Sequence, residues 1–120
     1  MGVTPPRRSV REILSLNKLE RVVMEYFLRH ISAGEIIAAL DLKEEVKKRA
    51  KQGEADLVSE LEDAIIVREV YVAMALLVKK GFLEYRNGAY RLADWIIEVI
   101  KAKKGSLQPG VPKSIQELLD

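Results

Sequence analysis

The segment Phe82 to Leu92, FLEYRNGAYRL, constrains the fold most strongly because it has the signature of a tight β-hairpin. Two short alternating runs flank Asn87-Gly88, and this pair favours a two-residue turn because both turn positions need positive φ. The turn pairs Tyr85 with Tyr90 and sets the register of the whole hairpin. One face is then expected to pack and the other to meet water or a partner. The packed face carries Leu83, Tyr85, Tyr90 and Leu92, and the other face carries Glu84, Arg86 and Arg91.

The segment before the hairpin, Val67 to Lys80, has the pattern of a core-facing helix. It contains no Gly, Pro, Asn or Ser. Lys79 and Lys80 fall in its last turn, where positive charge suits the helix dipole, and Gly81 follows as a left-handed cap. Apolar residues recur at helical spacing on one side, at Ile66, Val70, Ala73, Met74 and Leu77.

A helix that ends in KKGFL, followed by a hairpin that closes on Tyr90-x-Leu92, resembles the third helix and wing of the winged helix-turn-helix superfamily. In outline the resemblance covers Asn17 to Lys104. It implies a mainly α fold with a small β-hairpin. It also implies a function in binding, because many members bind DNA and others bind only proteins.

We expect one domain over residues 9–104, preceded by a flexible basic arm over residues 1–8, since Pro5-Pro6 cannot lie far inside a helix. Two capping boxes mark the starts of the first two helices of this domain. Ser9 to Glu12 is a capping box for a short helix over Val10 to Leu16. Asn17 to Glu20 repeats the pattern and begins a main helix that runs to His30. Its buried stripe is expected at Leu19, Val22, Val23, Tyr26 and Phe27.

The middle of the chain departs from the family pattern. Under the resemblance, Ile31 is a small first strand, and Ala33 to Leu40 is the second helix, capped by Ser32 and Glu35. Its inward residues are expected to be Ile36, Ile37 and Leu40. The third helix should follow after a short turn, yet residues 41–65 intervene. We predict an inserted helical hairpin there, with one arm from an Asp41 cap to Gln52, a break at Gly53, and a second arm that follows.

The C-terminal part is expected to hold one more helix and a tail. Asp94 to Lys104 reads as a helix with Trp95, Ile96, Val99 and Ile100 on it. Residues 105–120 begin as a Gly/Pro linker and end in a short amphipathic helix that a capping box at Ser114 to Glu117 introduces.

The composition argues against catalysis. The chain has no Cys, one His and none of the common catalytic or phosphate-binding motifs, so we expect no enzyme activity, no metal site and no cofactor. Apolar residues at 48% and charged residues at 32% indicate a folded globular protein. Abundant Lys, Glu, Val and Ile with few Asn and Gln suggest a thermophilic, archaeal-type source. No segment resembles a membrane span or signal peptide, so a cytoplasmic location is expected.

The first hypothesis is a dimeric DNA-binding protein that acts in transcription regulation or chromatin. In the resemblance, the outer face of the third helix enters the major groove of double-stranded DNA, and the wing grips phosphate. The basic stripe on residues 43–51 would add contacts. The candidate residues are Arg68, Tyr71, Lys79, Lys80, Arg86, Arg91, Lys47 and Lys48.

The second hypothesis is a protein-interaction module, because Val72, Ala75 and Leu76 make the centre of that outer face apolar. A homodimer is expected, because the insert and the last helix carry apolar residues that a small core would leave uncovered. Alternatively, the insert folds over the outer face of the third helix within one chain, and a monomer of this kind would favour the second hypothesis. The expected interface residues are Leu57, Leu61, Ile65, Trp95, Ile96, Val99 and Ile100.

Overall fold

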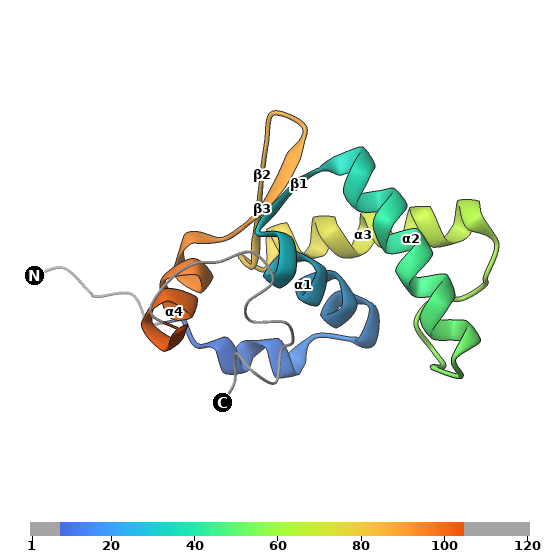
Figure 1. The fold of residues 1–120 in the computed structure, drawn as a ribbon, viewed down its shortest axis with the longest axis horizontal. Coiled ribbons are helices and arrows are strands. Elements are labelled where there is room, and N and C mark those ends of the chain that lie inside the picture. The colour runs from blue at the N-terminus through green and yellow to red at the C-terminus, as the bar shows by residue number, and fades with distance from the viewer. Residues whose placement is uncertain (1–7, 105–120) are drawn as a thin grey trace, which may run out of the picture.

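A computed structural model describes residues 8–104 of the chain (Figure 1). The fold is mainly helical with a small three-stranded antiparallel sheet, which confirms the expected fold class. In chain order the elements are η1 (Val10–Ser15), α1 (Lys18–His30), β1 (Ser32–Gly34), α2 (Glu35–Lys51), α3 (Asp63–Lys79), β2 (Leu83–Arg86), β3 (Ala89–Leu92) and α4 (Asp94–Lys104).

The sheet confirms the predicted hairpin register. Its strand order is β1-β3-β2, and Tyr85 lies opposite Tyr90 while Leu83 lies opposite Leu92. Asn87 and Gly88 have φ angles of 52° and 76°, as the two-residue turn requires. β1 covers the other edge of β3, and it occupies Ser32 to Gly34 instead of the single residue Ile31.

The predicted packed face of the hairpin is wrong for Tyr85. Leu83, Tyr90 and Leu92 are buried, whereas the Tyr85 side chain is 46% exposed. Tyr85 lies on the outer strand near the tip, where the ring of Tyr90, 4.8 Å away between centroids, covers only one side. This face is therefore packed at the base of the hairpin and along β3, the central strand of the sheet, but it is exposed near the tip of β2.

The first helices form as the capping boxes predicted. The side chains of Ser9 and Asn17 each accept a backbone N–H of their helix, and Glu12 and Glu20 accept in return. The predicted stripes of α1 and α3 are buried against each other in one core. The expected capping boxes and the expected buried stripes are thus confirmed. A helix with one continuous apolar stripe has only one face that it can bury, which is why the stripes could be predicted.

The second helix differs from the prediction at its start, its end and its buried face. Pairing with β3 makes Ser32 to Gly34 a strand, so no capping box forms there, and α2 begins at Glu35. The helix then continues without a break past Asp41, because no Gly or Pro interrupts it before Lys51. A single helix of this length buries one stripe, which consists of Ala38, Ala39, Leu42 and Val46. The residues expected inside, Ile36, Ile37 and Leu40, are exposed as a result.

The predicted second arm of a helical hairpin is also wrong. Residues 52–62 connect α2 to α3 without a helix, and Asp56 has a φ of 65°, which a right-handed helix excludes. Two side chains anchor this loop. Nζ of Lys18 donates to the carbonyl of Ala55 at 3.2 Å, and a carboxylate oxygen of Glu69 accepts the N–H of Ser59 at 2.9 Å.

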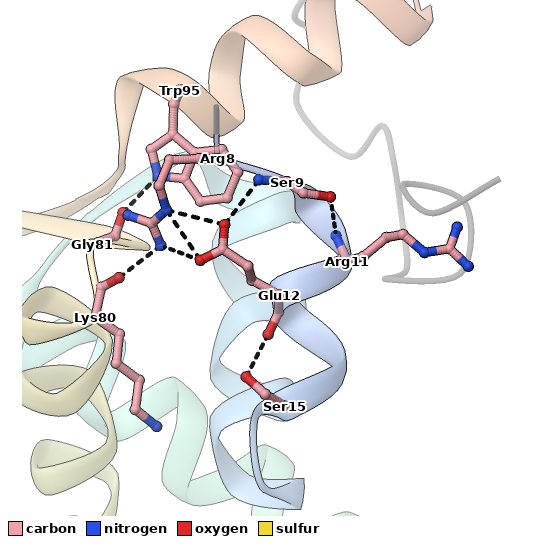
Figure 2. A network of polar contacts seen from close by, with 8 residues as sticks. All are labelled: Arg8, Ser9, Arg11, Glu12, Ser15, Lys80, Gly81 and Trp95. Carbon is pink, nitrogen blue, oxygen red and sulfur yellow. Dashed lines mark hydrogen bonds and ion pairs between the residues drawn. The ribbon is translucent and has the colours of Figure 1, made fainter. Parts of the chain in front are cut away.

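The start of the described chain is tied to the end of α3 and to α4 through Arg8 (Figure 2). The guanidinium group of Arg8 donates to the carboxylate of Glu12 and to the carbonyl of Lys80, at 2.9 Å in each case. It also lies over the ring of Trp95, 4.6 Å from the centroid, while the Trp95 indole N–H donates to the carbonyl of Gly81 at 2.7 Å. A Cβ at Gly81, which has a φ of 84°, would collide with this guanidinium group.

Two expectations concern residues that lie partly or wholly outside the described range. The basic arm at 1–8 is described only at Arg8, and the C-terminal segment 105–120 lies beyond α4. Among the described helices, none is long and apolar enough to cross a membrane.

Candidate partner-binding surface

Three large apolar side chains are exposed together on the first half of α2. Ile36, Ile37 and Leu40 are 67%, 63% and 50% exposed, and we name them the α2 patch. Scattered exposed apolar residues are common, but neighbouring ones on one element often mark a contact site, since covering them removes apolar area from water. The α2 patch is therefore a candidate surface for binding another protein.

Contacts at both ends hold the helix that carries the α2 patch. At the first turn, the N–H of Glu35 donates to the carbonyl of Gly88 at 2.9 Å, so the hairpin turn lies beside the patch. Further along the same helix, Lys43 and Lys47 reach the carboxylate of Asp63 at 3.6 and 2.8 Å. The α2 patch thus lies on a helix that the hairpin turn and the first turn of α3 both fix in place.

The hydroxyl of Tyr85 lies near the same turn, beside the carboxylate of Glu35. Partial desolvation and the neighbouring carboxylate of Glu35 raise the pKa of Tyr85 above its ordinary value. The pKa of Tyr90 is raised as well, by burial first and then by Glu35. The raised pKa keeps both hydroxyls protonated, as a tyrosine already is at neutral pH, and the partly exposed Tyr85 ring lies beside the first turn of α2.

A second apolar surface lies on α3, and we name it the α3 groove. The outer side of α3 forms one wall with Val72, 53% exposed, and Leu76. Leu57, from the loop after α2, lines the same groove, and the cavity in the groove has a volume of 430 Å³. The loop after α2 therefore folds against the side of α3 within one chain but leaves Val72 exposed. The other lining residues are Asn17, Leu19, Asp56, Arg68, Glu69 and Ala73.

Of the cations predicted to bind DNA, Lys47, Lys80 and Arg91 form ion pairs within the chain. Lys47 binds Asp63 at 2.8 Å, and Lys80 binds Glu20 at 2.6 Å. Arg91 lies between two carboxylates, those of Glu84 at 3.2 Å and Asp94 at 2.8 Å. These pairs neutralise charge that phosphate contact would need. The other candidates lie on different elements: Arg68, Tyr71 and Lys79 on α3, Lys48 on α2 and Arg86 on β2.

The structure corrects the expected dimer surface. Leu57, Ile96 and Ile100 are buried within a single chain, so the core covers residues that were expected to need a second copy. The short α4 and the loop after α2 pack onto the core directly, which explains the difference. Ile65, Trp95 and Val99 are half-buried, and only Leu61 in this set is largely exposed.

Sequence reasoning missed the α2 patch, although a signal for it was present. Residues 36–46 contain two apolar sets, Ile36/Ile37/Leu40 and Ala38/Ala39/Leu42/Val46, and these point to opposite sides of a helix. Because a helix at the surface buries one side, one of the two sets must remain exposed to solvent. Once the helix is recognised as continuous to Lys51, Leu42 and Val46 extend the stripe of the two alanines, and this longer stripe is the buried one.

Together these features define a small, mainly helical protein that presents apolar surfaces on two of its helices. The family model for PolB1 Binding Protein 2 matches residues 17–98, which is more than half of the chain, and the protein belongs to this family. The matched segment contains the α2 patch and the α3 groove. Searches of curated proteins and of solved structures gave no match.

Proposed function

We propose that this protein is a protein-interaction module that binds PolB1. The family description names this partner. Exposed apolar side chains within the matched segment supply a contact surface. The module has no need of a catalytic centre in this role, because its contribution is a rigid surface on a folded scaffold.

The scaffold we propose is of the winged-helix type. The order of α1, β1, α2, α3 and the β2–β3 hairpin supports this proposal, as does the position of β1 beside β3. The eleven residues 52–62 replace the short turn that the superfamily has between its second and third helices. In this protein the loop carries Leu57 to the side of α3, which makes that side a groove.

The α2 patch is the contact we propose for PolB1, and its exposure is the observation that carries the proposal. Ile36 and Ile37 are the two most exposed of the large apolar side chains in residues 8–104. Protein interfaces commonly depend on a few apolar anchors, and loss of one anchor costs more than about 1 kcal/mol of binding free energy. Two adjacent isoleucines on a fixed helix fit that role.

Binding of PolB1 to variants in solution tests the proposal. We expect Ile36→Ser with Ile37→Ser to weaken PolB1 binding by about 10-fold or more in isothermal titration calorimetry, since 1.4 kcal/mol corresponds to a factor of ten. Leu14→Ser is the matched control, because Leu14 is also an exposed apolar residue but lies outside the matched segment. Failure of the unaltered protein to bind PolB1 would refute the proposed function.

The same experiment distinguishes the α3 groove from the α2 patch. If Val72→Ser with Leu76→Ser abolishes PolB1 binding while the isoleucine variant binds normally, the contact lies on α3. Circular dichroism of each variant checks that the fold persists. Both pairs are exposed, so we expect each substitution to change the free energy of unfolding by less than about 1 kcal/mol.

DNA binding is the weaker proposal, because Lys47, Lys80 and Arg91 are engaged by carboxylates of the same chain. It can be separated from protein binding by its salt dependence. Each phosphate contact makes affinity for duplex DNA fall steeply with salt, whereas an apolar contact responds little. Measurement of both affinities between 50 and 200 mM salt compares the two directly.

A further inference from the structure

Among residues 8–104, no strand pairs with the outer edge of β2, so this edge of the hairpin is open in the described part of the chain. In the sheet order β1-β3-β2, both neighbours of β3 are within the chain, while β2 has a neighbour on one side only. In Figure 1 β2 is the outer strand of the hairpin, on the side away from α2, whose first residue Glu35 contacts Gly88 in the turn. An open strand edge presents unpaired backbone groups and is a ready template for another strand.

The hydrogen-bond pattern determines which residue presents these groups. Arg86 and Ala89 flank the two-residue turn, so they form a hydrogen-bonded pair, and the pairs alternate from there. Tyr85 opposite Tyr90 is then a non-bonded pair. Leu92 lies two residues after Tyr90 in β3, so its backbone groups should point to the same side as those of Tyr90. Its N–H indeed points away from β2 and donates to the carbonyl of Ile31 at 2.8 Å. The backbone N–H and C=O of Tyr85 therefore point to the open edge.

We propose that β2 pairs in antiparallel fashion with β2 of a second copy of this chain, with Tyr85 opposite Tyr85 of that copy. The two tyrosines would exchange both backbone hydrogen bonds across a two-fold axis. This interface is distinct from the surfaces that we expected on the insert and α4, and from the α2 patch. It does not depend on the proposal that the protein binds PolB1.

Charge complementarity identifies a second copy as the occupant. Antiparallel pairing about Tyr85 places Glu84 opposite Arg86 of the second copy, and Arg86 opposite Glu84. Both side chains lie on the exposed side of the strand, and Arg86 forms no ion pair with any residue in 8–104. The Glu-Tyr-Arg sequence is thus self-complementary, and the partly exposed Tyr85 rings meet on the opposite face.

Other registers lack this match. A two-fold axis through Glu84 would oppose two carboxylates and would use backbone groups that are directed at β3. A shift by one residue would place Glu84 opposite Tyr85 and leave both charges unmatched. Charged residues on a short edge strand usually prevent pairing, but in this register they attract because their signs alternate around Tyr85.

Charge reversal tests the proposal by sedimentation velocity of the full chain from 10 μM to 1 mM. We expect a concentration-dependent dimer for the unaltered protein. Arg86→Glu and Glu84→Arg should each weaken dimerisation by about 10-fold or more, because two attractive pairs become two repulsive ones. Arg11→Glu, at an exposed residue of η1, makes the same change in net charge as Arg86→Glu and should leave the dimer unchanged.

Recovery of dimerisation when the two charges are exchanged shows that the pairing of residues 84 and 86 itself is responsible. The double variant Glu84→Arg with Arg86→Glu restores the pairing with the charges exchanged, so it should dimerise within about 3-fold of the unaltered protein. An equimolar mixture of the two single variants should form a mixed dimer that neither forms alone. Thermal melting checks the fold, since Glu84→Arg removes the contact with Arg91. If Glu84→Arg fails to fold, the comparison of Arg86→Glu with Arg11→Glu decides, because neither of these changes touches the ion pair between Glu84 and Arg91.

Three results would overturn the proposal. A protein that stays monomeric to 1 mM has no such interface, and an Arg86→Glu variant that dimerises normally places the interface elsewhere. A monomeric protein whose affinity for PolB1 falls on Arg86→Glu would assign the strand edge to that partner instead of a second copy.

Discussion

Nζ of Lys80, the residue that caps the C-terminus of α3, lies 2.6 Å from a carboxylate oxygen of Glu20, which is only 2% exposed. The other oxygen of Glu20 accepts the N–H of Asn17 at 3.0 Å and completes the cap of α1. One buried carboxylate therefore fixes the start of α1 and the end of α3 together. A buried charge without a partner is costly, so this pair should be visible in stability measurements.

Lys80→Ala should lower the free energy of unfolding by about 1.5–3 kcal/mol, the usual contribution of a hydrogen bond to a charged group. Its neighbour Lys79 provides the control, because it is exposed and its alanine variant should cost less than about 0.5 kcal/mol. Urea denaturation measures both. Equal losses for the two lysines would contradict a specific role for the pair.

Leu92→Ala should cost about 2–5 kcal/mol, because Leu92 is fully buried at the base of the hairpin. Arg86→Ala, at the exposed end of β2, should change the free energy of unfolding by less than about 0.5 kcal/mol. Thermal melting of the two variants at low protein concentration makes the comparison. Similar melting temperatures would show that the hairpin packs in another register.

Arg8→Ala should change the fluorescence of Trp95, the single tryptophan of the chain, because the guanidinium group lies over its ring. Loss of this cation–π contact should also lower stability by about 0.5–1 kcal/mol, the value for exposed sites. Arg11 points away from the same cluster in Figure 2, so Arg11→Ala is the matched control. An unchanged emission spectrum in Arg8→Ala would place Trp95 in a different environment.

Stability should fall in acid partly through Glu45. A hydrogen bond from Arg49 is the main cause that holds the pKa of Glu45 below its ordinary value of 4.5. The contribution is fully present above about pH 4.5, and it is lost as pH falls through the lowered pKa of the folded state, because the unfolded chain binds the proton first. Glu45→Gln should therefore flatten the loss of stability between pH 5 and pH 3 in urea titrations. The same pH dependence of stability with and without Glu45→Gln would contradict this role of Glu45.

The fold class and the hairpin could be predicted because their determinants are local. Asn87-Gly88 defines a turn, and the turn defines every pair in the hairpin. The capping boxes at Ser9 and Asn17 are local in the same sense. Long-range pairing explains what failed, since β3 draws Ser32 to Gly34 into a strand that the local Ser-x-x-Glu pattern does not indicate.

The candidate surface was less predictable, because exposure depends on what the rest of the chain covers. From the sequence, Ile36 and Ile37 are predicted to be core residues, but Leu42 and Val46 define the buried face of a longer helix. Ile96 and Ile100 are predicted to be interface residues, although they are buried in the core of the same chain. Likewise, a count of lysines and arginines cannot reveal that Arg91 lies between two carboxylates.

The Arg8 cluster has a practical consequence for the limits of the domain. A fragment trimmed to the family-matched residues 17–98 would lose Arg8, the buried Ile13 of η1 and the buried Ile100 of α4. The indole of Trp95 would remain, but without the cation that covers it. The cooperative folding unit therefore extends beyond the recognisable homology unit on both sides, and fragments for expression should begin before Arg8 and end after Ile100.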